Sequence, residues 1–310
     1  MKACLKPLTT ACALLALLLS VASAKTPVKS TPFESAGGGP TYYIDYASFQ
    51  GIEDKTYVEF YFQIGHNDLQ FIKKGKQFQA GYDLDFSVYD QDDAVVEQQR
   101  ISDIFEVDTF AETQSIRKAR VFLMAFSFDP GKYRIKAELT DTETRNVSVI
   151  EEYITAESFR TSDLCISDIQ LSQHIKPAKE GEPYVKNQRY IEPNPVRTFA
   201  LGLGDVCVYF EVYNLMPEGG DDQTEYVAHF IFRHEDGKEF AHLKRQHKKP
   251  GTTAAHSIKL PVEHFLNGRY SLTVRIEDQD TRQIAETTRD FTVLDWPISM
   301  NELGYDQFIR

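Results

Sequence analysis

The stretch GKYRIKAELTDTETR, residues 131–145, occurs again with substitutions as GRYSLTVRIEDQDTR, residues 268–282. Within each copy apolar side chains alternate with polar ones. This period of two places one face of a β-strand on a core and the other in water. Asp141 and Asp278 end the two alternating runs, where an aspartate accepts backbone N–H groups in a turn. The stretch therefore predicts one strand and its turn, present in two copies.

Two further segments upstream repeat in the same order. YDLDFSVYDQDD, residues 82–93, matches YVAHFIFRHEDG, residues 226–237. VEFY, residues 58–61, matches FEVY, residues 210–213. Only the connecting loops differ in length, and the segments keep the alternating pattern of strands rather than a helical period. The repeat therefore extends over a whole domain.

These repeats predict an all-β chain of two tandem immunoglobulin- or fibronectin-III-like antiparallel β-sandwiches. We place the first at residues 41–157 and the second at 158–296. The phrases FDPGKY and FLNGRY lead into the repeated strand and resemble the tyrosine corner of such sandwiches. In that corner a tyrosine hydroxyl satisfies an upstream backbone group. We therefore assign Tyr133 and Tyr270 a structural role.

The beginning of the chain has the pattern of a secretory signal peptide. Lys2 and Lys6 precede an apolar run from Leu8 to Val21, and an Ala-Ser-Ala sequence ends at Ala24. We expect cleavage after Ala24 and export to the periplasm or the cell exterior. The apolar run is too short to span a bilayer, so no transmembrane segment is expected in the mature chain. Residues 25–40, rich in Pro, Gly, Ser and Thr, are predicted to be a flexible linker.

The charge and motif content exclude several classes of function. The 310 residues carry a formal charge of −12, from 34 basic and 46 acidic side chains, so no nucleic-acid partner is expected. The sequence has no nucleophile elbow, no zinc-protease motif and no phosphate-binding loop. We therefore predict no enzyme, assign no catalytic residue or metal ligand, and expect no cofactor. Two acidic turns, Asp90–Asp93 and Asp221–Glu225, lack EF-hand spacing but keep calcium binding open as an alternative.

Two cysteines remain once the signal peptide is removed, Cys165 and Cys207. In an exported protein they are candidates for a disulfide, which persists in an oxidising compartment. The alternative is two small core-like side chains, because only geometry decides whether a bridge forms. The sequence has no C-x-x-C motif, so neither a zinc site nor a thioredoxin-type redox site is expected.

The largest segment without a counterpart in the other copy is His174–Gly204. It carries Tyr184, Arg189 and Tyr190, and loops rich in aromatic and basic residues suit a protein or glycan partner. We therefore name these three side chains as candidate binding residues. The alternative is that the segment wraps the interface between the domains and covers a strand edge.

The chain contains the phrases YASFQGIEDKTYVEFYFQI (46–64), LCISDIQLSQHI (164–175), IEPNPVRTF (191–199), YFEVYNL (209–215) and GRYSLTVRIED (268–278). These phrases resemble the N-terminal region of bacterial GWxTD-domain-containing proteins, over residues 41–296. The resemblance implies a setting in the envelope of Bacteroidetes-like bacteria. The naming motif is absent, and residues 297–310 resemble the start of that family's C-terminal helical domain, cut short. No site residue is therefore transferred from the family.

The function expected from these observations is that of an exported, non-enzymatic binding or scaffold protein of the bacterial envelope. Its partner would be another protein or a glycan. One alternative is an accessory N-terminal part of an enzyme or larger envelope protein whose functional domain lies beyond residue 310. A further alternative is a calcium-dependent adhesin that uses the acidic turns.

Overall fold

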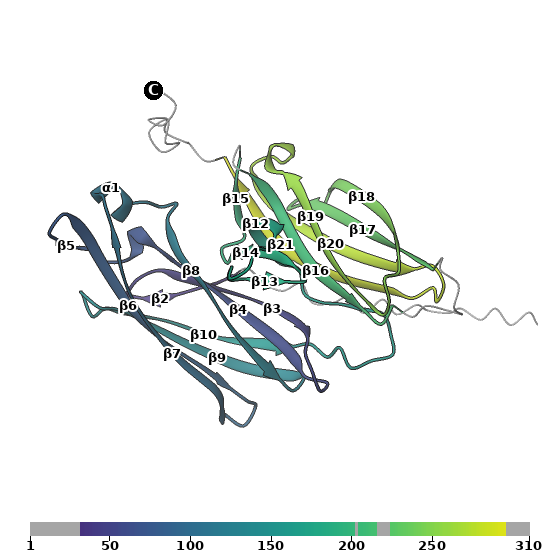
Figure 1. The fold of residues 1–310 in the computed structure, drawn as a ribbon, viewed down its shortest axis with the longest axis horizontal. Coiled ribbons are helices and arrows are strands. Elements are labelled where there is room, and N and C mark those ends of the chain that lie inside the picture. The colour runs from purple at the N-terminus through teal and green to yellow at the C-terminus, as the bar shows by residue number, and fades with distance from the viewer. Residues whose placement is uncertain (1–31, 202–203, 216–223, 296–310) are drawn as a thin grey trace, which may run out of the picture.

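The computed structural model describes residues 32–201, 204–215 and 224–295, and in these ranges the chain is almost entirely β (Figure 1). Its α-helix there is the four-residue α1 (Phe110–Thr113). The strands form two sandwiches side by side, the first purple to teal and the second green to yellow in Figure 1. The predicted fold class, two tandem immunoglobulin-like β-sandwiches, is confirmed. No helix in the described ranges is long and apolar enough to cross a membrane.

The first sandwich consists of two sheets around one apolar core. Its strands are β1 (Phe33–Glu34), β2 (Ala36–Gly37), β3 (Tyr42–Gln50), β4 (Thr56–Gly65), β5 (Ile72–Lys74), β6 (Gln77–Tyr89), β7 (Val95–Val107), β8 (Ala119–Phe128), β9 (Gly131–Asp141) and β10 (Val147–Ala156). One sheet has the order β1-β3-β4-β8. The other has the order β2-β10-β9-β6, with β5 and β7 both paired with β6. The alternating side chains of β4, β6 and β9 fill the space between the sheets.

The second sandwich follows the same plan. Its strands are β11 (Cys165–Ile166), β12 (Gln170–Pro177), β13 (Val185–Lys186), β14 (Arg189–Pro193), β15 (Thr198–Ala200), β16 (Asp205–Tyr213), β17 (Glu225–His234), β18 (Glu239–Lys248), β19 (Thr253–Pro261), β20 (Gly268–Asp278) and β21 (Ile284–Leu294). One sheet has the order β11-β16-β12-β14-β13, with β19 also paired with β16. The other has the order β15-β21-β20-β17-β18. The β15–β21 pair is parallel.

The two sandwiches share one topology, as a duplication requires. The order β3-β4-β8 of the first corresponds to β12-β16-β19 of the second. The order β10-β9-β6-β7 corresponds in the same way to β21-β20-β17-β18. The repeated segments of the sequence occupy equivalent strands, since β9 and β20 hold the two copies of the stretch that begins Gly-x-Tyr.

The repeated tyrosines and aspartates make equivalent bonds in both copies. The Tyr133 hydroxyl donates to the carbonyl of Asp129 at 2.8 Å, four residues upstream. The Tyr270 hydroxyl donates to the carbonyl of Leu266 at 3.1 Å, also four residues upstream. Asp141 and Asp278 each accept, through Oδ1, from the backbone N–H groups two and three residues later. The residues shared by the copies therefore hold turns and corners.

The structure departs from the predicted flexible linker over residues 25–40. Within that stretch β1 pairs with β3, and β2 pairs with β10. Phe33 stacks on the Tyr46 ring with centroids 6.0 Å apart, so apolar packing and ladder bonds tie the segment to both sheets. The prediction is therefore wrong for residues 33–37. The predicted signal peptide and the predicted helical segment at 297–310 lie outside the described residues.

The two cysteines are not bridged. Cys165 lies opposite Tyr213 in the β11–β16 pair, whereas Cys207 stands six residues earlier on β16. At about 3.3 Å per strand residue, roughly 20 Å separates them, and a disulfide needs Cα atoms within about 7 Å. The candidate disulfide is therefore corrected to two free thiols. Cys207 is buried between the sandwiches, as a core-like side chain would be.

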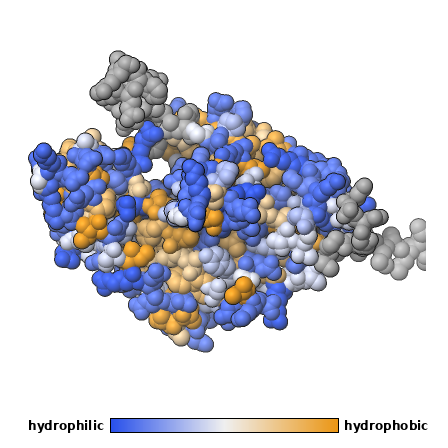
Figure 2. Space-filling model, viewed as in Figure 1, coloured by the Kyte–Doolittle hydropathy of each residue, from blue (hydrophilic) through white to orange (hydrophobic). Residues whose placement is uncertain are grey.

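Hydrophilic residues cover most of the face shown in Figure 2. Hydrophobic residues gather near its middle, on the first sandwich.

Candidate functional site at the domain interface

A third apolar cluster lies between the two sandwiches. Its side chains stand on strand faces that point away from the core of their own sandwich, faces that would meet water in an isolated sandwich. The members from the first sandwich are Ala47, Phe49 and Tyr61, and those from the second are Ile175, Ile191, Cys207 and Tyr209. The cluster gives the two sandwiches a shared apolar interface.

A buried ion cluster lies beside this apolar patch. Asp45 of β3, Arg197 of the loop before β15 and Arg289 of β21 are each 3% exposed or less. Arg197 Nε donates to Asp45 Oδ2 at 2.9 Å, and Arg289 Nη2 donates to Asp45 Oδ1 at 2.5 Å. Burial by itself would raise the pKa of Asp45, but the two guanidinium charges outweigh it and hold that pKa below its ordinary value. The carboxylate is therefore charged and paired with both arginines.

The β13–β14 hairpin inserts a lysine into the interface. Lys186 Nζ lies 2.6 Å from Glu59 Oε2 and 2.6 Å from Gln170 Oε1. The same nitrogen lies 4.0 Å from the centre of the Phe49 ring and 5.0 Å from that of Tyr209, within cation–π range. Burial lowers the pKa of Lys186, while the Glu59 carboxylate opposes this shift. The ammonium group of Lys186, desolvated and paired with Glu59, thus attaches the hairpin to the first sandwich.

Equivalent glutamates of the two copies meet at this hairpin. Glu59 accepts from the Tyr61 hydroxyl, and Glu211 accepts from the Tyr213 hydroxyl, two residues downstream in each case. Asn187, next to Lys186, donates to Glu211 Oε1 at 3.0 Å. Both carboxylates are thus engaged by tyrosines and by the hairpin. They serve as anchors of the interface.

Backbone groups are also satisfied across the interface. The Ser48 N–H donates to Asp168 Oδ2 at 2.7 Å, and the Gln50 N–H donates to the Tyr213 hydroxyl at 3.0 Å. The Tyr184 hydroxyl donates to the carbonyl of Val121, on the edge strand β8, at 2.7 Å. A hydrogen bond has a narrow range of favourable angles, so these bonds fix the orientation of one sandwich relative to the other.

The three candidate binding residues lie together on the hairpin. Tyr184 contacts the first sandwich through its hydroxyl, and its ring lies 6.2 Å from that of Tyr190. Lys176 Nζ lies 4.6 Å from the centre of the Tyr190 ring. Arg189 bonds within the hairpin, to the carbonyl of Asn187 at 3.3 Å. The segment therefore adopts the alternative arrangement, wrapping the domain interface, and the binding role of the three side chains stays a prediction.

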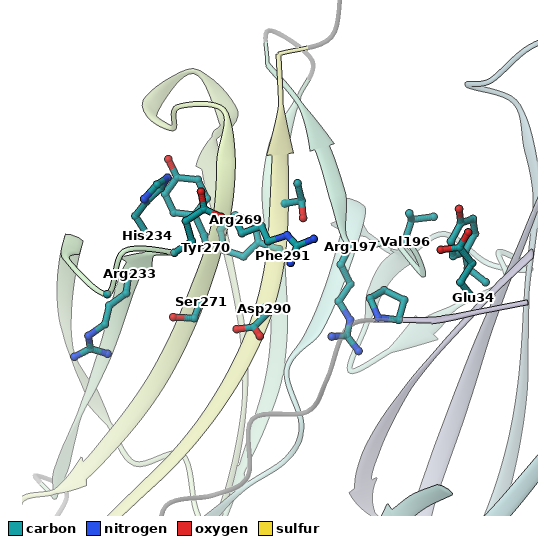
Figure 3. A pocket seen from close by; sticks show the side chains of 15 residues that line it. Glu34, Val196, Arg197, Arg233, His234, Arg269, Tyr270, Ser271, Asp290 and Phe291 are labelled. Atoms are coloured by element: carbon teal, nitrogen blue, oxygen red, sulfur yellow. The ribbon is translucent and has the colours of Figure 1, made fainter. Parts of the chain in front are cut away.

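A pocket of about 680 Å³ opens beside the interface. Figure 3 shows Arg233, Ser271 and Asp290 of the second sandwich on one side and Glu34 of the first on the other. Burial raises the pKa of Asp290, and the positive charges of two nearby arginines oppose the rise. The walls carry both signs of charge together with aromatic rings. Such a lining suits a polar ligand or a mixed-charge loop of a partner.

The acidic turn Asp90–Asp93, which the structure describes, is not arranged as a cation site. Asp90 Oδ1 accepts from the N–H groups of Asp92 and Ala94, and the Asp93 carboxylate pairs with Arg134 at 2.9 Å. Asp221 and Asp222 lie outside the described residues. No group of three or more His, Cys, Asp or Glu residues in the described ranges is arranged to hold a metal ion.

Sequence reasoning missed Asp45 and Arg289 as interface residues. The sequence does contain a pattern that could have identified Arg289. This residue occupies a core-facing position of the alternation in β21, between Thr287 and Phe291. A charged residue at such a position needs a buried partner. The outward side of β3 is also apolar at Ala47 and Phe49, which indicates a second covered face.

The sequence matches no protein-family model and no curated protein. Among solved structures, one similar chain is Bacteroides uniformis β-glucuronidase 2 covalently bound to cyclophellitol-6-carboxylate aziridine, at 9% identity and a TM-score of 0.26. The match covers 76% of this chain and 26% of that chain. Another is a putative β-galactosidase from Bacteroides fragilis, at 11% identity and a TM-score of 0.25, covering 80% of this chain and 34% of that one. The chain thus spans about a third or less of these structures, and scores at this level carry no argument about activity.

Proposed function

We propose that this chain is an exported, non-enzymatic binding or scaffold protein of the bacterial envelope whose two sandwiches are held at one fixed angle. The observation that carries the proposal is the buried cluster in which Asp45 of the first sandwich pairs with Arg197 and Arg289 of the second. Domains in one chain are expected to move relative to each other unless their interface is large and apolar. In this chain an apolar cluster and directional ion pairs together oppose such motion between the two sandwiches.

The chemistry of the interface supports a scaffold more than a catalyst. Glu59 and Lys186, a carboxylate and an amine of the interface, are paired with each other and buried. A general base or nucleophile must reach a substrate, which these groups cannot do while the hairpin is in place. Their contribution is orientation, because separating the sandwiches would break the pair and expose the Phe49 and Tyr209 rings to water.

A fixed angle gives a binding surface that spans both domains. The pocket between Glu34 and Arg233 is built from both sandwiches, so its shape depends on their arrangement. We place the ligand or partner loop there, with Arg269 and Asp290 as the groups that would recognise opposite charges. The hairpin residues Tyr184, Arg189 and Tyr190 remain candidates for contact with a larger partner.

Small-angle X-ray scattering of the purified chain tests the fixed angle. We expect one compact arrangement to account for the scattering of the native chain in both low and high salt. Asp45→Ala combined with Phe49→Asp removes the ionic and apolar contacts together, and we expect its radius of gyration to increase. Asp85→Ala, at a half-exposed surface pair with Arg100, is the matched control. A native profile that requires several interdomain angles would overturn the proposal.

A further inference from the structure

The strands β7 and β18 are edge strands that occupy equivalent places in the two sandwiches. In the described residues β7 pairs with β6 alone and β18 with β17 alone, so the free side of each presents backbone N–H and C=O groups to solvent. β7 has 13 residues and β18 has 10, whereas natural edge strands are often very short. Figure 1 shows β7 at the lower boundary of the first sandwich and β18 at the upper right of the second. The molecule thus has two long open edges on different sides.

The side chains of both edges are accessible. Every residue of β18 is exposed or half-buried, and Val107 is the one buried residue of β7. The other long edge strands, β8 and β19, are more enclosed, with two buried residues each. Val96 and Ile104 of β7 and Phe240 of β18 are exposed apolar side chains, and covering them with a neighbouring strand would be favourable. Both edges are therefore suited to accept a further strand, as in recognition by strand addition.

Charges that are not paired within the chain make β7 an acidic edge. Arg100 and Asp103 of this strand already lie in ion pairs with residues of the same sandwich. Glu97 and Glu106, by contrast, have no ion pair among the described residues. The strand therefore has negative charge available to a partner strand.

The same comparison makes β18 a basic edge. Its one carboxylate, Glu239, lies 4.0 Å from Arg233 of the neighbouring strand β17. Lys244, Arg245 and Lys248 are exposed and have no ion pair within the described ranges. Three positive charges on this edge are therefore available to a partner.

The opposite signs decide which edges can pair. Like charges directly opposite each other destabilise a strand pair, so β18 does not suit a second β18, and β7 does not suit a second β7. Charged side chains commonly protect open edges in this way. The protection fails where a basic edge meets an acidic one, because there the same charges attract. We propose that β18 of one copy of this chain adds as a strand to β7 of a second copy, joined by main-chain hydrogen bonds and by attraction between the two sets of charges.

The contact joins unlike edges, so every copy of the chain carries both halves of it. Contacts of this heterologous kind close into a ring or continue as a filament, depending on the rotation between successive copies. The contact uses neither the apolar cluster nor the ion cluster between the sandwiches. It therefore goes beyond the proposed scaffold role of one chain and predicts an assembly of chains.

Sedimentation equilibrium of the tag-free chain over roughly 1 µM to 1 mM tests the contact, because a small interface of this kind is expected to be weak. In about 0.15 M salt the screening length is about 8 Å, which reduces the repulsion between whole chains of charge −12 but spares ions in contact. We expect the average molar mass of the native chain to rise with its concentration. Hydrogen exchange should become slower in residues 95–107 and 239–248 alike over the same range.

Charge reversal on β18 tests the role of its lysines. Lys244→Glu with Lys248→Glu gives the strand the sign of β7 and should raise the dissociation constant roughly tenfold or more. Both side chains are exposed, so the fold should be retained. Lys132→Glu with Lys179→Glu changes the net charge equally at exposed positions outside both edge strands. This control should associate as the native chain does.

Charge reversal on β7, made by Glu97→Lys with Glu106→Lys, should weaken self-association in the same way. An equimolar mixture of the two reversed chains offers the new acidic β18 to the new basic β7, and the native β18 to the native β7. We expect association to return in this mixture. A general loss of folding in the variants would not produce that recovery.

Three results would overturn the proposal. The first is a native chain that stays monomeric at every concentration. The second is a chain with reversed β18 that associates as strongly as the control, and the third is a mixture of the reversed chains that stays unassociated. If a reversed chain does not fold, hydrogen exchange of the native chain decides alone. Increasing protection in only one of the two strands, or in neither, contradicts the pairing.

Discussion

Arg197 Nε donates a hydrogen bond to Asp45 Oδ2 at 2.9 Å, although 152 residues separate the two in the sequence. The same carboxylate accepts from Arg289, on the last strand of the second sandwich. One negative charge of the first domain is thus shared by two buried guanidinium groups of the second. The stability of the interface should therefore depend strongly on Asp45.

Asp45→Ala leaves Arg197 and Arg289 buried without their shared partner. Removing one member of a buried ion cluster costs about 3–5 kcal/mol, because the remaining charges are desolvated and unpaired. We expect the free energy of unfolding, measured by urea denaturation, to fall by that amount. Asp85→Ala breaks only half-exposed contacts and should cost about 1 kcal/mol or less. Equal effects of the two substitutions would show that the cluster adds no more than a surface pair.

The Lys186–Glu59 pair allows a test in which a second change restores stability. Lys186→Met keeps the length of the side chain but leaves the Glu59 carboxylate, 2% exposed, without its cation. We expect a loss of about 3 kcal/mol in the free energy of unfolding. Adding Glu59→Gln removes the unpaired charge and should recover most of that loss. Lys74→Met, on an exposed lysine of β5, is the control and should change little.

This prediction is contradicted if the double variant is no more stable than Lys186→Met alone. Such a result would mean that the hairpin is held by Tyr184 and Asn187, whose hydrogen bonds to Val121 and Glu211 remain in both variants.

The fold could be predicted from the sequence because its signal is local. Alternating side chains in residues 58–64, 82–88, 133–139 and 270–276 fall within β4, β6, β9 and β20. A strand with one buried face produces this period wherever it lies in the chain. The repeat also predicts the number of domains, because each copy forms a hydrophobic core of its own.

The interface could not be predicted in the same way, because it depends on how two finished domains meet. No local pattern relates Asp45 to Arg289, and Lys186 lies in a segment without a counterpart in the first copy. The segment His174–Gly204 shows the difficulty well. Its tyrosines and basic residues suit an external partner by composition, yet Tyr184 and Lys186 are engaged by the first sandwich.

Acid should destabilise the chain through His256. Burial, followed by the positive charges of His247, Arg189 and Arg245, lowers the pKa of His256 to about 4. In the unfolded chain the imidazole takes up a proton near pH 6.5, which the folded chain cannot do until about pH 4. This contribution to stability is therefore complete above pH 6.5 and is lost as the pH falls to about 4, by at most about 3 kcal/mol.

His256→Gln removes that titration while leaving a group that can bond to the Tyr226 hydroxyl. We expect its free energy of unfolding to fall less between pH 7 and pH 4.5 than that of the native chain, by about 2 kcal/mol. His264→Gln, at an exposed position, should follow the native curve. Parallel curves for the native chain and His256→Gln would show that His256 is protonated as readily in the folded state as in the unfolded one.

The two tyrosine corners should differ in strength although they share one geometry. The Tyr133 hydroxyl makes one backbone hydrogen bond, whereas the Tyr270 hydroxyl donates to the Leu266 carbonyl and accepts from the Leu266 N–H at 3.0 Å. Tyr270 is also 2% exposed, whereas Tyr133 is only partly buried. We expect Tyr133→Phe to cost about 1 kcal/mol and Tyr270→Phe about 2 kcal/mol in the free energy of unfolding, measured by urea denaturation.

Tyr153→Phe, at a side chain 75% exposed, is the control and should cost nothing measurable. If Tyr133→Phe and Tyr270→Phe were both as neutral as Tyr153→Phe, the repeated tyrosines would stabilise the fold through ring packing alone, and the hydroxyls would need another explanation.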